Sequence, residues 1–262
     1  MYSSSVPSSE LDFHPQKLFP RYSRLAATSA LSNLGFSAFR RTLPFAWDQK
    51  NTESERLLPQ YLGSTPLAIV GYPRTGTTFL QFALEKEMNS GGQIFKNHDA
   101  FSIEYLSSRG IPVLIPVRDP RDTCISWSFY NKDKLSRKSA LSRLASYLAW
   151  HRIAHQYIAH ENVFSIPFIA FSQQLACIPN HILQKLEISS SLDVSQTTGL
   201  MSDFHAIQND LKLDLRVSNT PSAARQQATE SYKKIYDQLS GHRLMTKAQN
   251  LYEEFCLESS KD

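Results

Sequence analysis

The stretch from Leu67 to Thr78 reads LAIVGYPRTGTT, and it decides the fold of this chain. Its first four residues are apolar, which is typical of a short buried strand. Gly71 and Gly76 have the spacing of a phosphate-binding Gly-x-x-x-x-Gly loop, after which helix-forming residues continue to Met88. In such a loop, backbone N–H groups and the N-terminus of the next helix converge on an anion. The stretch therefore predicts a strand, an anion-binding loop and a helix in succession.

This loop differs from that of ATP- and GTP-hydrolysing proteins in the place of its cation. In those proteins a lysine directly follows the second glycine and reaches the terminal phosphates. Here Thr77 stands at that position, and the cation lies inside the loop as Arg74. The hydroxyls of Thr75, Thr77 and Thr78 add further donors. We expect the loop to bind an anion without hydrolysing a triphosphate; the alternative is a turn that only caps the helix.

Three further apolar runs indicate strands, and they cover residues 93–96, 111–117 and 163–171. Helical patterns lie between and after them, over residues 101–108, 122–129, 138–160, 182–186 and, as two helices, 222–258. Strands that alternate with helices favour an α/β domain. We therefore expect a P-loop NTPase-like fold, with three α/β/α layers around a mostly parallel central sheet.

The start of the chain differs in composition from the rest. Its Ser- and Pro-rich sequence predicts that residues 1–64 form an N-terminal extension, partly helical or loosely ordered. Residues 65–262 then form the P-loop α/β domain, with a helical C-terminal part. The serines and arginines of the extension leave an organelle transit peptide open, although the expected location is the cytoplasm.

Composition limits the classes of function. The chain has 262 residues and a formal charge of +4, which fits an anionic small-molecule ligand and does not require nucleic acid. No run of about 20 apolar residues occurs, so we expect no transmembrane segment. The odd, scattered set of three cysteines argues against a disulfide framework and a structural zinc site, and it favours a reducing compartment.

The loop resembles that of the sulfotransferases that use 3′-phosphoadenosine 5′-phosphosulfate (PAPS). That family carries a Tyr-Pro-Lys-Ser-Gly-Thr-Thr-Trp loop for the 5′-phosphosulfate, and residues 72–79 here read Tyr-Pro-Arg-Thr-Gly-Thr-Thr-Phe. The charge and the first hydroxyl are kept, and the resemblance extends over roughly residues 65–190. It implies that the cofactor is held by Arg74, Thr75, Gly76, Thr77 and Thr78.

A second motif of the family is an Arg-Asp-Pro-(Lys/Arg)-Asp turn with a serine eight residues after the arginine. Residues 118–122 read Arg-Asp-Pro-Arg-Asp, and Ser126 follows at that spacing. The resemblance implies that Arg118 and Ser126 hold the 3′-phosphate of the cofactor. The family's C-terminal Arg-Lys-Gly…Gly-Asp-Trp segment is not recognisable, and the nearest basic and polar candidate is the stretch from Arg216 to Arg225.

A third match is Lys96-Asn97-His98, which resembles the Lys-x-His of many cytosolic members. It implies that His98 is the catalytic base and that Lys96 stabilises charge on the transferring sulfuryl oxygens. Asp99 or Glu104 could be the base instead, because other branches of the family use a carboxylate.

The predicted function is therefore transfer of a sulfuryl group from PAPS to a hydroxyl or amine of a small-molecule or glycan acceptor. Arg74 would stabilise the leaving phosphate, and no metal is expected. The alternatives are a non-catalytic nucleotide-binding protein of the same fold and, third, a P-loop kinase. The sequence indicates neither the acceptor nor the oligomeric state.

Two further patterns are expected to be structural. His151 and His155 lie four residues apart in a helical stretch without an evident third metal ligand, so we expect a partly exposed helix face. A basic run is expected to form a solvated face that could attract an anion, and it comprises Lys132, Lys134, Arg137, Lys138 and Arg143.

Overall fold

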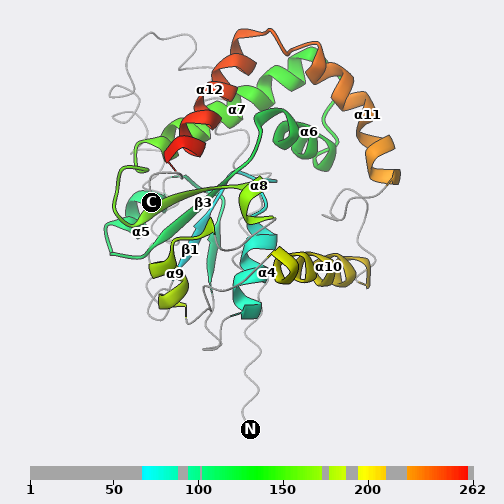
Figure 1. Ribbon diagram of the computed structural model, residues 1–262. Helices are drawn as coiled ribbons and strands as arrows, with labels where there is room; N and C mark the ends of the chain where they lie inside the picture. Colours follow the sequence, from blue (N-terminus) through cyan, green and yellow to red (C-terminus); the bar gives the residue numbers. More distant parts are fainter. Residues whose placement is uncertain are drawn as a thin grey trace, which may run out of the picture.

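A four-stranded parallel sheet forms the centre of the computed structural model (Figure 1). The structure describes residues 67–87, 94–100, 102–172, 177–186, 194–210 and 223–258, so the predicted extension over residues 1–64 lies outside the described part. The strand order is β2-β1-β3-β4, and every neighbouring pair is parallel. The strands are β1 (Ala68–Val70), β2 (Phe95–Asn97), β3 (Val113–Val117) and β4 (Val163–Pro167).

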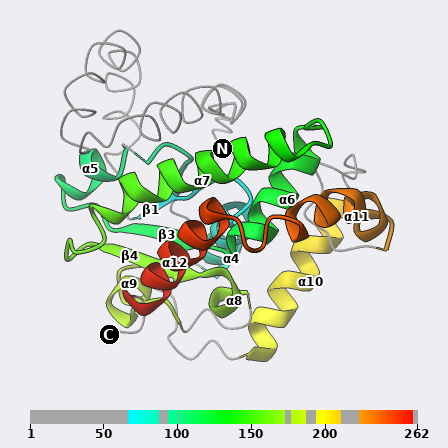
Figure 2. The same ribbon diagram turned by 90° about the horizontal axis from the view of Figure 1, so that it is seen from above.

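Helices cover both faces of this sheet (Figures 1 and 2). One face packs against α5 (Ser102–Ser107), α6 (Pro120–Tyr130), α7 (Arg137–His155) and α12 (Arg243–Glu258). The other face packs against α4 (Thr77–Glu87), α8 (Phe168–Phe171) and α9 (Asn180–Lys185). Two more helices lie outside these layers: α10 (Val194–Asp210) packs on α4, and α11 (Ala223–Asp237) packs on α6 and α7.

The alternation of side chains along the strands separates two buried cores. Ala68 and Val70 of β1 belong to the core beneath α7, whereas Ile69 belongs to the core beneath α4. A strand buried on both faces reads as a continuous apolar run, because neither face is exposed to water. The predicted α/β fold with three layers and a parallel sheet is confirmed.

The predicted apolar run over residues 163–171 is wrong as a single strand. It divides at Pro167, which ends β4 and caps the short helix α8. An apolar run does not distinguish a buried strand from a buried helix. Helix α10 was not predicted; its Leu200 and Phe204 are buried in the core beneath α4, and Phe204 meets Phe79 with ring centroids 5.6 Å apart.

Proline at position 116 is accommodated inside β3. The β1–β3 pairing ends with Ile69 opposite Leu114, so the missing N–H of Pro116 lies beyond that ladder. On its other side Pro116 pairs with Ile166 of β4. The strand that was expected over residues 111–117 begins two residues later than predicted, at Val113.

Two side chains of α7 that were expected near solvent are buried instead. His151 is fully buried, where its ring stacks on Tyr147 at 3.8 Å and its Nδ1–H donates to the Tyr147 carbonyl. Among the residues that the structure describes, its Nε2 has no hydrogen-bond partner. Arg143 is 2% exposed, because its Nε and Nη2 bind the two carboxylate oxygens of Asp133, each at 2.5 Å. A charge or an imidazole can be buried in this way when it is paired or kept neutral.

The buried imidazole gives a testable pH dependence. Burial lowers the pKa of His151 to about 3. Below pH 6.5 the unfolded chain therefore binds a proton that the folded chain excludes, and the free energy of unfolding falls towards pH 3, by about 5 kcal/mol from this group. In urea titrations at several pH values, His151→Phe is expected to reduce the dependence of the free energy of unfolding on pH, by the amount that corresponds to the uptake of about one proton on unfolding. His160→Gln, at an exposed position, is the control; equal slopes in wild type and His151→Phe would contradict the assignment.

Candidate functional site

The site lies where the chain changes direction across the sheet. From β1 the chain moves to β2 on one side and then crosses to β3 on the other. In open parallel sheets a crevice forms at the carboxyl ends of two strands whose connections diverge in this way. The loop of residues 71–76, called the anion loop below, follows β1, and Arg118 follows β3. Both predicted motifs therefore lie at the same edge of the sheet.

The anion loop is wound tightly, with left-handed backbone at two positions. Arg74 has φ +74° and Gly76 has φ +97°. A Cβ on Gly76 would lie 2.6 Å from the ring of Phe168, and a Cβ on Gly71 would lie 2.6 Å from the methyl of Thr77. Both glycines are required because no side chain fits at either position. The backbone can therefore curl above the N-terminus of α4.

The three threonines of the motif have different environments. Thr75 is fully buried, and its hydroxyl donates to the Tyr72 carbonyl at 2.7 Å, so its proton stabilises the loop itself. Thr77 is 3% exposed and begins α4. Thr78 is exposed, and its Oγ1 accepts from Lys96 Nζ at 3.5 Å. Of the three hydroxyls, that of Thr78 is the one open to solvent.

Two guanidinium groups converge on the hydroxyl of Ser126, which lies on α6, and a third lies beside them. Arg74 Nε donates to Ser126 Oγ at 3.0 Å, and Arg225 Nη2 of α11 reaches the same oxygen at 3.3 Å. Arg118 Nη1 lies 3.5 Å from the carbonyl oxygen of Arg74. We call Arg74, Arg118 and Arg225 the arginine cluster. The structure thus brings the predicted Arg118 and Ser126 together through Arg74, and it adds Arg225.

Aromatic rings support all three members of the cluster. The guanidinium carbon of Arg74 lies 5.5 Å from the ring centre of Tyr130, that of Arg118 lies 4.7 Å from Phe168, and that of Arg225 lies 5.2 Å from Phe129. Cations over ring faces gain modest attraction without being neutralised. Within the described residues, neither Arg74 nor Arg118 forms an ion pair. Arg118 is nevertheless close enough to Asp122 and Asp119 for their carboxylates to favour its charged form, whereas no described carboxylate is a cause of the pKa shift of Arg74.

The electrostatics of the cluster favour an anion. Burial, followed by repulsion from Arg225 and Arg118, lowers the pKa of Arg74 to about 9. Burial also lowers the pKa of Arg118, and burial together with Arg118 lowers that of Arg225. Groups of like charge with such shifts are stabilised by an opposite charge placed between them. The cluster has the chemistry of a phosphate or sulfate site.

Arg225 is the member of the arginine cluster that the sequence indicated only within a longer candidate stretch, from Arg216 to Arg225. Residues 211–222 lie outside the described part, whereas Arg225 lies in the first turn of α11. Two tyrosines fix this helix on α6 and the following turn: Tyr236 OH bonds Ser128 Oγ at 3.0 Å, and Tyr232 OH donates to the Asp133 carbonyl at 2.9 Å. These contacts place Arg225 at Ser126 across 99 residues of sequence.

The predicted base lies beside the anion loop. Because β2 ends at Asn97, His98 is the first residue after the strand. Its Nδ1 lies 2.6 Å from the carbonyl oxygen of Gly71. A carbonyl only accepts, so Nδ1 carries a proton and Nε2 is the basic nitrogen of the neutral ring. Of the alternative bases, Glu104 accepts a hydrogen bond from Tyr157 OH at 2.8 Å, and the backbone carbonyl of Asp99 caps α5 by accepting from Ser102.

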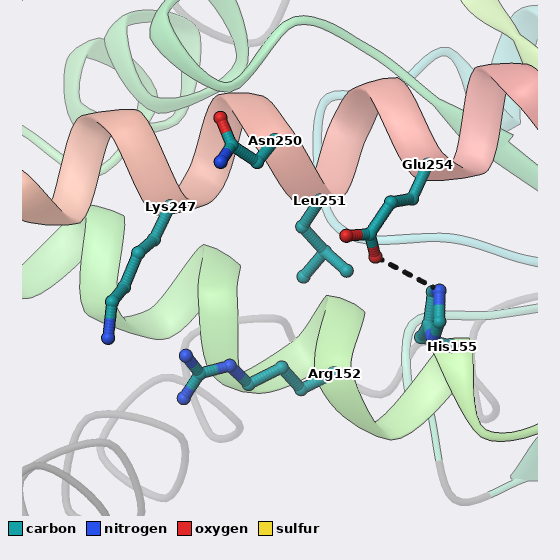
Figure 3. Close-up of a pocket in the computed structure, with 6 residues that line it drawn as sticks. All are labelled: Arg152, His155, Lys247, Asn250, Leu251 and Glu254. Atoms are coloured by element: carbon teal, nitrogen blue, oxygen red, sulfur yellow. Dashed lines mark ion pairs between the residues drawn. The ribbon is translucent and has the colours of Figure 1, made fainter.

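A separate hollow lies between α7 and α12 (Figure 3). His155 and Glu254 face each other across it, with Nε2 and Oε2 3.2 Å apart, while the side chains of Arg152 and Lys247 extend away from this pair. None of its lining residues belongs to the arginine cluster. The described residues also contain no group of three His, Cys, Asp or Glu placed to hold a metal, and no helix among them has the length and apolarity to cross a bilayer.

The similarity of this chain to known proteins is weak. No protein-family model matches the chain, and no curated protein matches it. Among solved structures, the chain is similar to the crystal structure of mouse sulfotransferase SULT7A1 complexed with PAP, at 14% sequence identity and a TM-score of 0.45. The match covers 72% of this chain and 89% of that chain. Values this low carry no conclusion about activity, so function has to be inferred from the site itself.

The two glycines with left-handed backbone allow a controlled test of the loop. Gly76→Ala is expected to destabilise the protein by more than about 2 kcal/mol, because its Cβ would meet Phe168 in addition to the backbone strain. Gly110 has φ +69° with nothing within 4 Å, so Gly110→Ala should cost only about 1 kcal/mol. Urea unfolding measures both. Equal losses would show that the packing around Gly76 is not tight.

The arginine cluster predicts that one substitution affects stability little and anion binding strongly. Arg225→Gln removes one of three repelling charges, so the free energy of unfolding without anion should change by less than about 1 kcal/mol. Affinity for sulfate or pyrophosphate should fall about tenfold, because a charge-assisted hydrogen bond is lost. Thermal unfolding across an anion titration measures both quantities. Arg137→Gln, at the exposed start of α7, is the matched control; an unchanged anion response in Arg225→Gln would contradict the assignment.

Proposed function

We propose that this protein is a sulfotransferase that uses PAPS and releases adenosine 3′,5′-bisphosphate. The observation that carries the proposal is the convergence of Arg74 and Arg225 on Ser126, beside Arg118. Together with the anion loop, it offers two places for negative charge: the backbone N–H groups at the start of α4, and the arginine cluster against α6. The resemblance of the loop and of the Arg118–Ser126 motif to PAPS-dependent sulfotransferases agrees with this pair of sites.

Two separate anion sites fit a nucleotide phosphorylated on two sides of its ribose. A linear triphosphate places its phosphates in one row along the loop, where a lysine after the second glycine reaches the terminal pair. This chain has Thr77 at that position. Arg118 and Arg225 lie instead beside α6, where a 3′-phosphate would sit, while the 5′ end would occupy the loop that carries Arg74. This distribution favours PAPS over ATP.

His98 is suited to accept the proton of the acceptor. In the proposed reaction the acceptor oxygen or nitrogen attacks sulfur in line, the bond from sulfur to the leaving phosphate oxygen breaks, and its electron pair stays with the bisphosphate. The acceptor proton passes to Nε2, because the bond between Nδ1–H and the Gly71 carbonyl fixes that tautomer. The same bond holds the ring against the first residue of the anion loop.

Charge that develops during transfer has nearby donors. Arg74 and the N–H groups of the anion loop would stabilise the leaving phosphate oxygen, as fixed dipoles do in phosphoryl transfer. Lys96 lies at the other side of the loop, with its ammonium 3.5 Å from the Thr78 hydroxyl, and would stabilise the sulfuryl oxygens. The acceptor is proposed to be a hydroxyl or amine of a small molecule or glycan, and no step requires a metal.

Calorimetric binding of adenosine 3′,5′-bisphosphate, ADP and ATP tests the proposal. We expect the bisphosphate to bind tightest, and Arg118→Ala to weaken it about tenfold or more, because one charged contact is lost. Arg109→Ala, at an exposed arginine that lies over the ring of Tyr105, is the matched control and should bind as wild type does. Preference for ATP with a Mg²⁺ requirement would favour a kinase, and absence of nucleotide binding would overturn the proposal.

A substitution of the predicted base distinguishes catalysis from nucleotide binding. His98→Gln should retain bisphosphate binding and lose sulfuryl transfer in a screen of acceptor hydroxyls and amines. Tight binding with no transfer in wild type would instead identify a non-catalytic nucleotide-binding protein. Transfer that persists in His98→Gln would remove His98 as the base and leave Asp99 and Glu104 to be tested.

A further inference from the structure

We propose that Tyr147 and Trp150 are positioning residues, through which α7 holds His98 and Arg118 at a fixed separation. The inference rests on the proposed function, because it concerns how the predicted base and the predicted phosphate-binding arginine come to act on one ligand. Neither side chain belongs to a motif of the anion loop, and neither was assigned a role from the sequence.

Two hydrogen bonds from one helix reach the ends of two strands. Trp150 Nε1–H donates to the backbone carbonyl of His98, at the end of β2, at 2.9 Å. Tyr147 OH donates to the backbone carbonyl of Arg118, at the end of β3, also at 2.9 Å. Residues three apart share one face of a helix, so both donors point towards the sheet from adjacent turns. Both side chains are fully buried.

The same helix face also holds the loop after β1. Tyr72 is 1% exposed, and its hydroxyl donates to Ser146 Oγ at 3.3 Å. Its ring packs edge-on against Tyr147 and Trp150, with centroids 5.5 Å and 6.1 Å away. Helix α7 therefore contacts the carboxyl ends of β1, β2 and β3, which are the three points that carry the site.

These contacts act on backbone, which is why they set position without touching a ligand. A carbonyl that accepts from a buried donor fixes the peptide unit directly after the residue whose side chain acts in the site. Such a hydrogen bond is costly to break. Burial raises the pKa of Tyr147 well above its usual value, so the phenol keeps the proton that it donates. The distance between the two fixed carbonyls is then set by one turn of a rigid helix.

The first experiment removes the phenol alone. Tyr147→Phe should raise the calorimetric Kd of adenosine 3′,5′-bisphosphate about three- to tenfold, the worth of one hydrogen bond. Tyr157→Phe is the matched control: it also removes the phenol of a buried tyrosine and a partly buried hydrogen bond, from Tyr157 OH to Glu104, yet it should leave that Kd unchanged. Equal Kd values in wild type and Tyr147→Phe would overturn the role of Tyr147.

The second experiment needs no nucleotide. In ¹⁵N spectra of the imidazole rings, His98 should show the tautomer protonated at Nδ1, and Trp150→Phe should shift it towards the Nε2-protonated form that predominates in free imidazole side chains. Trp127→Phe removes a similar volume from the buried core of α6 and should leave the His98 signals unchanged. A merely structural role for Trp150 predicts the same small change in both variants, and that result would overturn its assignment.

Failure of the proposed function and failure of this inference are distinguishable. If the wild-type protein binds no bisphosphate, the sulfotransferase proposal fails, and the His98 tautomer still reports whether Trp150 positions that residue. If the bisphosphate binds and Tyr147→Phe and Tyr157→Phe behave alike, the proposed function stands and the positioning role of Tyr147 fails.

Discussion

Repulsion among Arg74, Arg118 and Arg225 is the constraint on which the rest of the site depends. Three guanidinium groups gathered at a largely buried edge of the sheet raise the free energy of the folded chain, since water screens them poorly there. The protein tolerates this arrangement because each group lies over an aromatic ring and because two of them share the Ser126 hydroxyl. An anion converts the repulsion into attraction, so the site is already organised for one.

That organisation requires a rigid support, which the sheet and α7 supply. Parallel strands bring their carboxyl ends to one edge, and β1, β2 and β3 deliver the anion loop, His98 and Arg118 to it. The buried aromatic side chains of α7 then hold all three segments from one side. Phe168 of α8 supports the opposite side, where it lies against both Gly76 and Arg118.

Local patterns in the sequence predict the parts of this site that follow strands. The apolar run before Gly71 and the loop spacing were sufficient to place a strand, a turn and a helix, and the ends of parallel strands necessarily meet. Contacts that depend on how helices pack could not be predicted from local patterns. Nothing near Arg225 in the sequence indicates Ser126, and nothing beside His151 indicates full burial, because both depend on partners about 100 residues away. The helix α8 was missed since Phe168 to Phe171 are as apolar as the strand before them.

The order in which the site can form follows from the separation of its parts along the chain. The contacts of the arginine cluster join residues 44, 52 and 99 positions apart, and each requires a long chain segment to close first. Closing long segments costs chain entropy before any contact compensates it, so non-local structure of this kind forms slowly and late. A partly folded chain in which α11 has not docked holds only two of the three cations. Full affinity for an anion therefore arises only in the last stage of folding, and the ligand stabilises the completed molecule without stabilising its incomplete precursors.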